Sequence, residues 1–142
     1  MRLLSLILAT CWIHMSFSAV PSEEPVTLTI RVQGIPHSIG DVRVGVYDSP
    51  AKFRSSTGVA YQKVQAAEKG NMTIRLSLQP GSYAVAVFHD ANANGKLDTN
   101  FLGIPTEVYG FSNNARGTFG PPDFNDCLIT ITGPTTISIR LD

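Results

Sequence analysis

Apolar and polar residues alternate along most of this chain, at the period of two that is typical of β-strands with one buried face. Residues 83–88 are apolar at nearly every position, as expected for a central strand covered on both faces, and 59–66 is a weaker candidate. No segment repeats apolar residues at the 3.6-residue period of a helix. The remaining predicted strands are 26–33, 41–47, 72–78, 129–131 and 137–141.

Turn-forming residues separate these six or seven short strands. Glycine, proline and aspartate mark the connections at 34–40, 48–50, 79–81 and 133–134. Successive strands with one apolar face predict an antiparallel β-sandwich of the immunoglobulin-like or prealbumin-like kind. No linker interrupts the pattern, so we expect a single domain.

The segment 90–126 has no clear strand over 37 residues, far more than the usual loop of about 4–6 residues. Loops of this length are usually functional or disordered. The aromatic residues in this one favour order, and we expect one long ordered loop. They are Phe101, Tyr109, Phe111, Phe119 and Phe124.

The first 18 residues resemble a cleavable signal peptide. Arg2 gives the positive start, an apolar stretch follows to residue 17, and Ser16 and Ser18 suit a cut after residue 18. The stretch is shorter than the roughly 20 residues that span a bilayer, so we expect no transmembrane anchor. Residues 8–11 loosely resemble a lipobox, but we favour simple cleavage. The prediction is a mature domain of residues 19–142 that is periplasmic or secreted.

The 11 basic and 11 acidic residues leave no net charge, which argues against a nucleic-acid partner. Removing the signal would leave Cys127 as the only cysteine, so no internal disulfide is expected. We expect Cys127 to be a small buried core residue.

A possible calcium loop directly follows the central strand. Oxygen-bearing side chains stand at positions 1, 3, 5 and 9 of the run 90–98, with glycine at position 6, a spacing that lets a tight loop wrap one hard cation. Ca²⁺ takes six to eight oxygens. The expected ligands are Asp90, Asn92, Asn94, the Lys96 carbonyl and Asp98, with Glu107 completing the shell.

Two features limit this hypothesis. An EF-hand ends with glutamate at position 12, where this chain has Phe101, and the flanking segments are not helical in pattern. The alternative is a turn in which Asn and Asp bond their own backbone and need no metal. We favour the ion, in a structural role.

Other residues suggest chemistry less strongly. His89, Asp90 and Glu107 could together form a metal-dependent hydrolase site, but we expect His89 to point away from Asp90 and to bond loop backbone. A ligand surface is predicted from four residues, although the polar ones could instead satisfy the backbone of the long loop. These are Tyr109, Phe111, Asn113 and Arg116.

An ordered series of motifs resembles a known family. The series comprises Leu-Gln-Pro-Gly-Ser-Tyr at 78–83, the run 89–98, Gly-Ile-Pro-Thr-Glu-Val-Tyr-Gly-Phe-Ser-Asn at 103–113 and Phe-Gly-Pro-Pro at 119–122. It is similar to the exported bacterial family known as domain of unknown function 2141. That resemblance implies a periplasmic or secreted domain without an established activity.

The entry into the strand at 83 is also similar to that of transthyretin-like and carboxypeptidase-regulatory sandwiches. The Tyr-Arg-Gly-Ser ending of the hydroxyisourate hydrolases is missing, since this chain ends Ser-Ile-Arg-Leu-Asp. We therefore expect a Ca²⁺-stabilised binding or structural module of the cell envelope, more than an enzyme, whose partner is a glycan, a peptide or an envelope component. The alternatives are the hydrolase and a transthyretin-like carrier of a small ligand.

Overall fold

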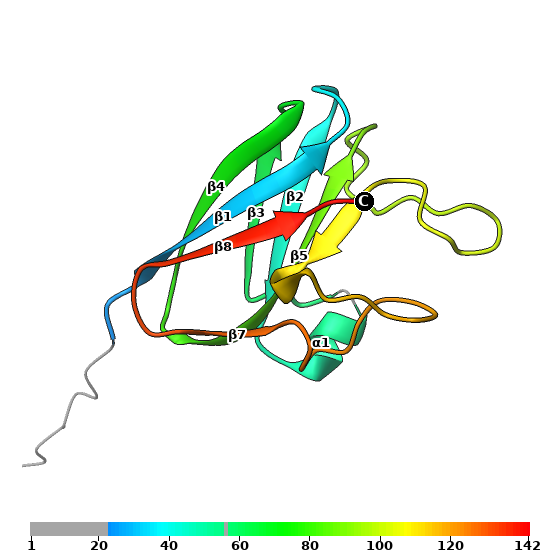
Figure 1. The fold of residues 1–142 in the computed structure, drawn as a ribbon. Coiled ribbons are helices and arrows are strands. Elements are labelled where there is room, and N and C mark those ends of the chain that lie inside the picture. Colours follow the sequence, from blue (N-terminus) through cyan, green and yellow to red (C-terminus); the bar gives the residue numbers. More distant parts are fainter. Residues whose placement is uncertain (1–22, 56) are drawn as a thin grey trace, which may run out of the picture.

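The computed structural model describes residues 23–55 and 57–142, and in them two β-sheets pack face to face as an all-β sandwich (Figure 1). Sheet A has the order β4 (Gly70–Leu78), β1 (Val26–Ile35), β8 (Thr135–Arg140). Sheet B has the order β3 (Tyr61–Ala66), β2 (Asp41–Tyr47), β5 (Gly81–Asp90), β6 (Tyr109–Phe111), and β7 (Leu128–Ile131) also pairs with β5. Two short helices, α1 (Pro50–Ser55) and the 3-10 turn η1 (Ser112–Asn114), connect strands.

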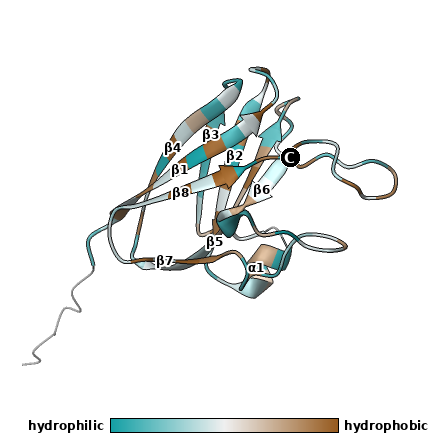
Figure 2. Cartoon of the chain, in the orientation of Figure 1, coloured by the Kyte–Doolittle hydropathy of each residue, from teal (hydrophilic) through white to brown (hydrophobic). Residues whose placement is uncertain are grey.

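The alternation of the sequence produces the core. Apolar and polar residues alternate along the strands (Figure 2). Side chains of successive strand residues point to opposite faces, so the apolar positions of both sheets meet between them. Leu28, Ile30 and Val85 are fully buried there. The polar positions of sheet A lie on its outer face, where Thr27, Arg31 and their cross-strand neighbours are exposed.

Three details differ from the prediction. The sheets are not all antiparallel, because β8 runs parallel to β1, with Ile30 opposite Ile137; side-chain alternation is the same for either direction. There are eight strands in the described residues, because β6 divides the long segment 90–126. Within that segment Phe101 and Phe119 are 94% and 102% exposed, so these two rings do not help to order it.

The two residues that follow β8 join the two sheets. The amide of Leu141 donates to the Gln33 carbonyl in sheet A. The backbone of Asp142 exchanges two hydrogen bonds with Tyr109 of β6, at 3.2 and 3.3 Å. The two sheets are thus joined by backbone hydrogen bonds at this corner, where a Cβ on Gly110 would lie 2.3 Å from the Arg140 carbonyl.

The predicted signal peptide, residues 1–18, falls outside the described part of the chain. Within residues 23–55 and 57–142, no helix has the length and apolar character that crossing a membrane requires.

Candidate functional site

A groove of about 1170 Å³ lies on the outer face of sheet B. Strand register explains how it forms, because the residues of its floor are cross-strand neighbours. Gln62, Gly45, Ala86 and Phe111 stand side by side across β3, β2, β5 and β6. The two central positions of this row carry a hydrogen atom and a methyl group, so the middle of the sheet is low.

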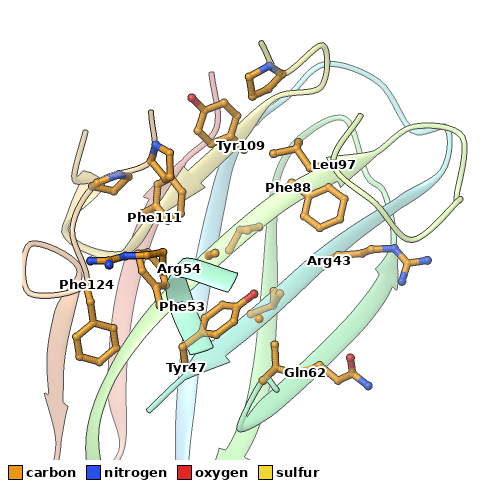
Figure 3. A pocket seen from close by; sticks show the side chains of 18 of the residues that line it. Arg43, Tyr47, Phe53, Arg54, Gln62, Phe88, Leu97, Tyr109, Phe111 and Phe124 are labelled. Carbon is orange, nitrogen blue, oxygen red and sulfur yellow. The ribbon is translucent and has the colours of Figure 1, made fainter. Parts of the chain in front are cut away.

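The neighbouring row forms one side of the groove. Val64, Arg43, Phe88 and Tyr109 stand opposite one another in the same four strands. The rings of Phe88, Tyr109 and Phe111 project from the sheet on the groove side (Figure 3). Residues of the loop 95–105 extend this side.

A small aromatic cluster forms the opposite side. Phe53 of α1 packs edge-on against Tyr47, Phe111 and Phe124, with ring centroids 5.5–5.9 Å apart. Edge-to-face contacts of this kind hold rings in fixed orientations. The Tyr47 ring also lies over Gly45, where an added Cβ would meet ring atoms at 3.1 Å. This side of the groove is therefore built from rigid, interlocked rings.

Three of the four predicted ligand residues, Tyr109, Phe111 and Arg116, border a small second pocket of about 30 Å³. Tyr109 and Phe111 line the groove, although both are half-buried and not fully exposed. The Asn113 amide donates to the carbonyls of Asp126 and Leu128 and thereby satisfies loop backbone. Arg116 forms a two-bond ion pair with Asp142. Tyr109 and Phe111 thus lie together in the groove, whereas the side chains of Asn113 and Arg116 bond other groups of the protein.

The loop 90–98 borders the groove beside Arg43. The Asp90 carboxylate is fully buried and accepts hydrogen bonds from the amides of Asn94 and Gly95 at 3.0 and 2.8 Å. Nε of Arg43, from the adjacent strand β2, donates to the same carboxylate at 2.5 Å. Burial alone would raise the pKa of Asp90, but the Gly95 amide, Arg43 and the Asn94 amide outweigh it, so the pKa is lowered.

The other predicted calcium ligands are also close to one another. Nδ2 of Asn92 lies 2.6 Å from an Asp98 carboxylate oxygen, and Nδ2 of Asn94 lies 3.0 and 3.1 Å from the two oxygens. The amide oxygens of both asparagines accept backbone N–H groups two residues on, which forms Asx turns. The Glu107 carboxylate bridges the amides of Ala91 and Asp98.

These contacts define how a cation would fit. Asn92, Asn94 and Asp98 converge, and turning the two amides over would present oxygens where nitrogens now lie. Asp90 and Glu107 already have partners, and Arg43 supplies the positive charge beside Asp90. In the described residues no three His, Cys, Asp or Glu side chains gather as a metal site. Calcium binding therefore stays a prediction that rests on the loop's amides and Asp98.

His89 points into the sandwich, opposite to Asp90, as predicted. It is 1% exposed, and its Nε2 lies 2.7 Å from the Ile39 carbonyl. The His37 ring packs against it with centroids 4.6 Å apart. His89, Asp90 and Glu107 thus each have a structural contact, and the hydrolase alternative gains no support from this arrangement.

Sequence reasoning missed several groove residues. Arg43 and Gly45 appeared only as polar positions of an alternating strand, and Phe53 lay in a segment with no predicted structure. An available signal was the pairing of small residues with aromatic ones on the polar side of predicted strands, as in Gly45 and Tyr47. Cys127 is buried in the same cluster as Phe53, as predicted.

Comparison with known proteins gives one family. The model described as an uncharacterised protein conserved in bacteria, domain of unknown function 2141, matches residues 30–138. The chain belongs to this family. Neither the curated proteins nor the solved structures that were compared include a match. The matched residues include strands of both sheets, the loop 90–98 and all the described residues that line the groove.

Proposed function

We propose that this chain is a non-catalytic binding module of the bacterial cell envelope, exported by its N-terminal signal, which holds a glycan chain in the groove on sheet B. The observation that carries the proposal is the row of aromatic rings on this face. Sheet A has a polar outer face, as expected for contact with water, whereas the outer face of sheet B presents Phe88, Tyr109 and Phe111.

The composition of the groove supports a sugar ligand. Ligand sites combine apolar walls with a few polar groups that fix orientation, and a sugar ring has apolar faces and hydroxyl-bearing edges. The aromatic rings would contact the faces. Polar side chains of the lining would bond the hydroxyl groups, and they include Arg54, Gln62, Lys63 and Asn125.

The direction of the floor row disfavours a peptide that binds by strand addition. Such a peptide lies along the edge of a sheet and pairs with its backbone. The row from Gln62 to Phe111 runs across the strands, and the strand backbones beneath it already pair with one another. A chain bound across this row would find no open strand edge to pair with there.

The lining residues also favour binding over hydrolysis. Among residues 23–55 and 57–142, the lining includes no histidine, cysteine or serine, so these described residues supply neither the commonest general base nor the usual nucleophiles of ester and peptide hydrolysis. Its carboxylates, Asp123 and Asp126, lie on an exposed loop. The carrier alternative needs an oligomer with a shared pocket, which size-exclusion chromatography would detect.

The test fills the groove without removing a contact. Ala86→Leu places a larger side chain on the floor, and Ser82→Leu makes a similar change on the same face of β5 outside the lining. Binding is measured on an array of bacterial envelope glycans, with an array of peptides beside it. We expect glycan binding by the native chain and by Ser82→Leu, and at least tenfold weaker binding by Ala86→Leu. Equal binding by both variants, or binding to peptides alone, would overturn the proposal.

A second proposal concerns the loop 90–98, where Ca²⁺ would act as a structural ion. The convergence of Asn92 and Asn94 on Asp98 supports it. The ion would fix the start of the segment that borders the groove. Thermal unfolding with and without Ca²⁺ tests this proposal.

A further inference from the structure

The outer face of sheet A carries three arginines in a diagonal line. Thr29 of β1 is opposite Arg75 of β4, and Gln33 of β1 is opposite Arg140 of β8. Arg31 lies between these two rows on β1. Strands are about 4.8 Å apart and two residues span about 6.8 Å, so each step of the line is about 8 Å between Cα atoms. All three arginines are exposed.

No acidic residue balances these charges within sheet A. Strands β1, β4 and β8 contain no aspartate or glutamate. None of the three arginines forms an ion pair with any residue in the described part of the chain. The chain as a whole has no net charge, so this positive face is a local feature and not the result of a basic composition.

Protection of sheet edges explains only part of the arrangement. Charged side chains on edge strands discourage edge-to-edge aggregation, and that accounts for Arg75 on β4 and Arg140 on β8. Arg31 stands on β1, which is paired on both sides. An arginine there, between two like charges, repels its neighbours and has no partner in the sheet.

We propose that this face binds an acidic polysaccharide through Arg31, Arg75 and Arg140. Planar guanidinium groups bind carboxylate and sulfate oxygens in pairs of hydrogen bonds. Exposed hydroxyl groups between the arginines can bond the sugar hydroxyls, and they belong to Thr27, Thr73, Ser77, Thr136 and Ser138. The site is separate from the groove on sheet B, so the two proposals can fail independently.

The composition of the face argues against two other polyanions. Binding to single-stranded nucleic acid uses aromatic side chains on which bases stack, and the outward positions of sheet A have none. Stable attachment to a bilayer surface uses apolar side chains that enter it. The outward positions of β1 are Thr27, Thr29, Arg31 and Gln33, all polar. A hydrated acidic sugar chain fits this surface best.

The experiment measures binding of the whole chain to polygalacturonate at several NaCl concentrations, with neutral dextran and anionic phospholipid vesicles as comparison probes. Arg31→Gln is compared with Lys52→Gln, which removes the same charge from α1 near sheet B. An exposed ion pair contributes up to about 1 kcal/mol, a factor of about five. We expect about fivefold weaker binding for Arg31→Gln, about 100-fold for the triple arginine-to-glutamine variant, and no change for Lys52→Gln.

We also expect binding to weaken as the salt concentration rises. All variants should melt within a few degrees of the native chain, because the replaced side chains are exposed. Absent binding to polygalacturonate would overturn the proposal. Equal losses in Arg31→Gln and Lys52→Gln would overturn it as well, since they would show an effect of net charge alone. Tighter binding to the vesicles than to polygalacturonate would assign the face to a membrane surface instead.

Discussion

Replacing Arg43 by methionine tests how much the ion pair with Asp90 stabilises the fold. Methionine keeps an apolar stem and removes the guanidinium, so the fully buried Asp90 carboxylate keeps only its bonds to Asn94 and Gly95. Breaking a buried pair by removing one partner costs about 3–5 kcal/mol. The Arg43 side chain is 26% exposed, so water reaches the vacated place, and we expect a loss of about 2–3 kcal/mol.

Thermal unfolding by circular dichroism, in EDTA, measures this loss. For a domain of this size 1 kcal/mol corresponds to about 3–4 °C in Tm, so Arg43→Met should melt about 6–12 °C below the native chain. Lys63→Met, which removes an exposed charge from β3, should melt within about 2 °C of it. Adding Asp90→Asn to Arg43→Met should recover part of the loss, because no unpaired charge stays buried. Equal melting of the Arg43 and Lys63 variants would refute the reasoning.

The same variants test the calcium proposal. Ligand at 100 times its Kd adds about 2.7 kcal/mol, or roughly 10 °C here. Under the proposal Ca²⁺ raises the Tm of the native chain and has no effect on Asp98→Asn. It raises the Tm of Arg43→Met by more than that of the native chain, because the cation then also balances the Asp90 charge that has lost its guanidinium partner. Mg²⁺ is the control, since it prefers smaller, more regular octahedral sites. Unchanged melting with Ca²⁺ in every variant would identify the loop as a metal-free Asx turn.

Three further predictions follow from buried polar groups. The pKa of Asp90 lies below its ordinary value of 3.8. The ionised carboxylate therefore stabilises the fold above pH 3.8, and this stabilisation is lost as the pH falls through the lowered pKa. The Tm of the native chain should drop more steeply from pH 5 to 3 than the Tm of Asp90→Asn. Burial, with Asp126 and Asp123 nearby, raises the pKa of Cys127 to about 11. The thiol of the folded chain should therefore not react with a disulfide reagent at pH 8. A fast reaction without denaturant would contradict the burial of Cys127. Ser112→Ala leaves the Val85 amide and Cys127 carbonyl without their shared hydroxyl, which should cost about 1–3 kcal/mol, whereas the exposed control Ser138→Ala should melt unchanged.

The strands themselves could be predicted from the sequence, since burial on one face imposes the alternation that the chain shows. The short strand β6 could not. Its three residues carry too little pattern to detect, and they are extended because Tyr109 and Phe111 pair with β5 on one side while Asp142 pairs with Tyr109 on the other. The parallel direction of β8 was equally hidden, because alternation is independent of strand direction.

The residues of the candidate site could likewise be predicted only in part. Tyr109 and Phe111 were found because aromatic residues in a long loop stand out. The partnership of Arg43 with Asp90 joins residues 47 positions apart and exists only because β2 and β5 are neighbours. The groove depends on that same pairing, since Gly45 and Ala86 form a depression only where they lie opposite each other.

The parallel pairing of β1 with β8 has a consequence for the order of folding. Residues 28–33 find their second neighbour only among residues 135–140, so sheet A stays incomplete until the end of the chain is available. Contacts between such distant segments slow folding, and β-sandwiches take milliseconds to seconds. A chain still being synthesised thus keeps one edge of β1 open, with its backbone N–H and C=O groups unpaired on that side. Sheet A can take its final form only once residues 135–140 have been added, whichever other strands have already paired.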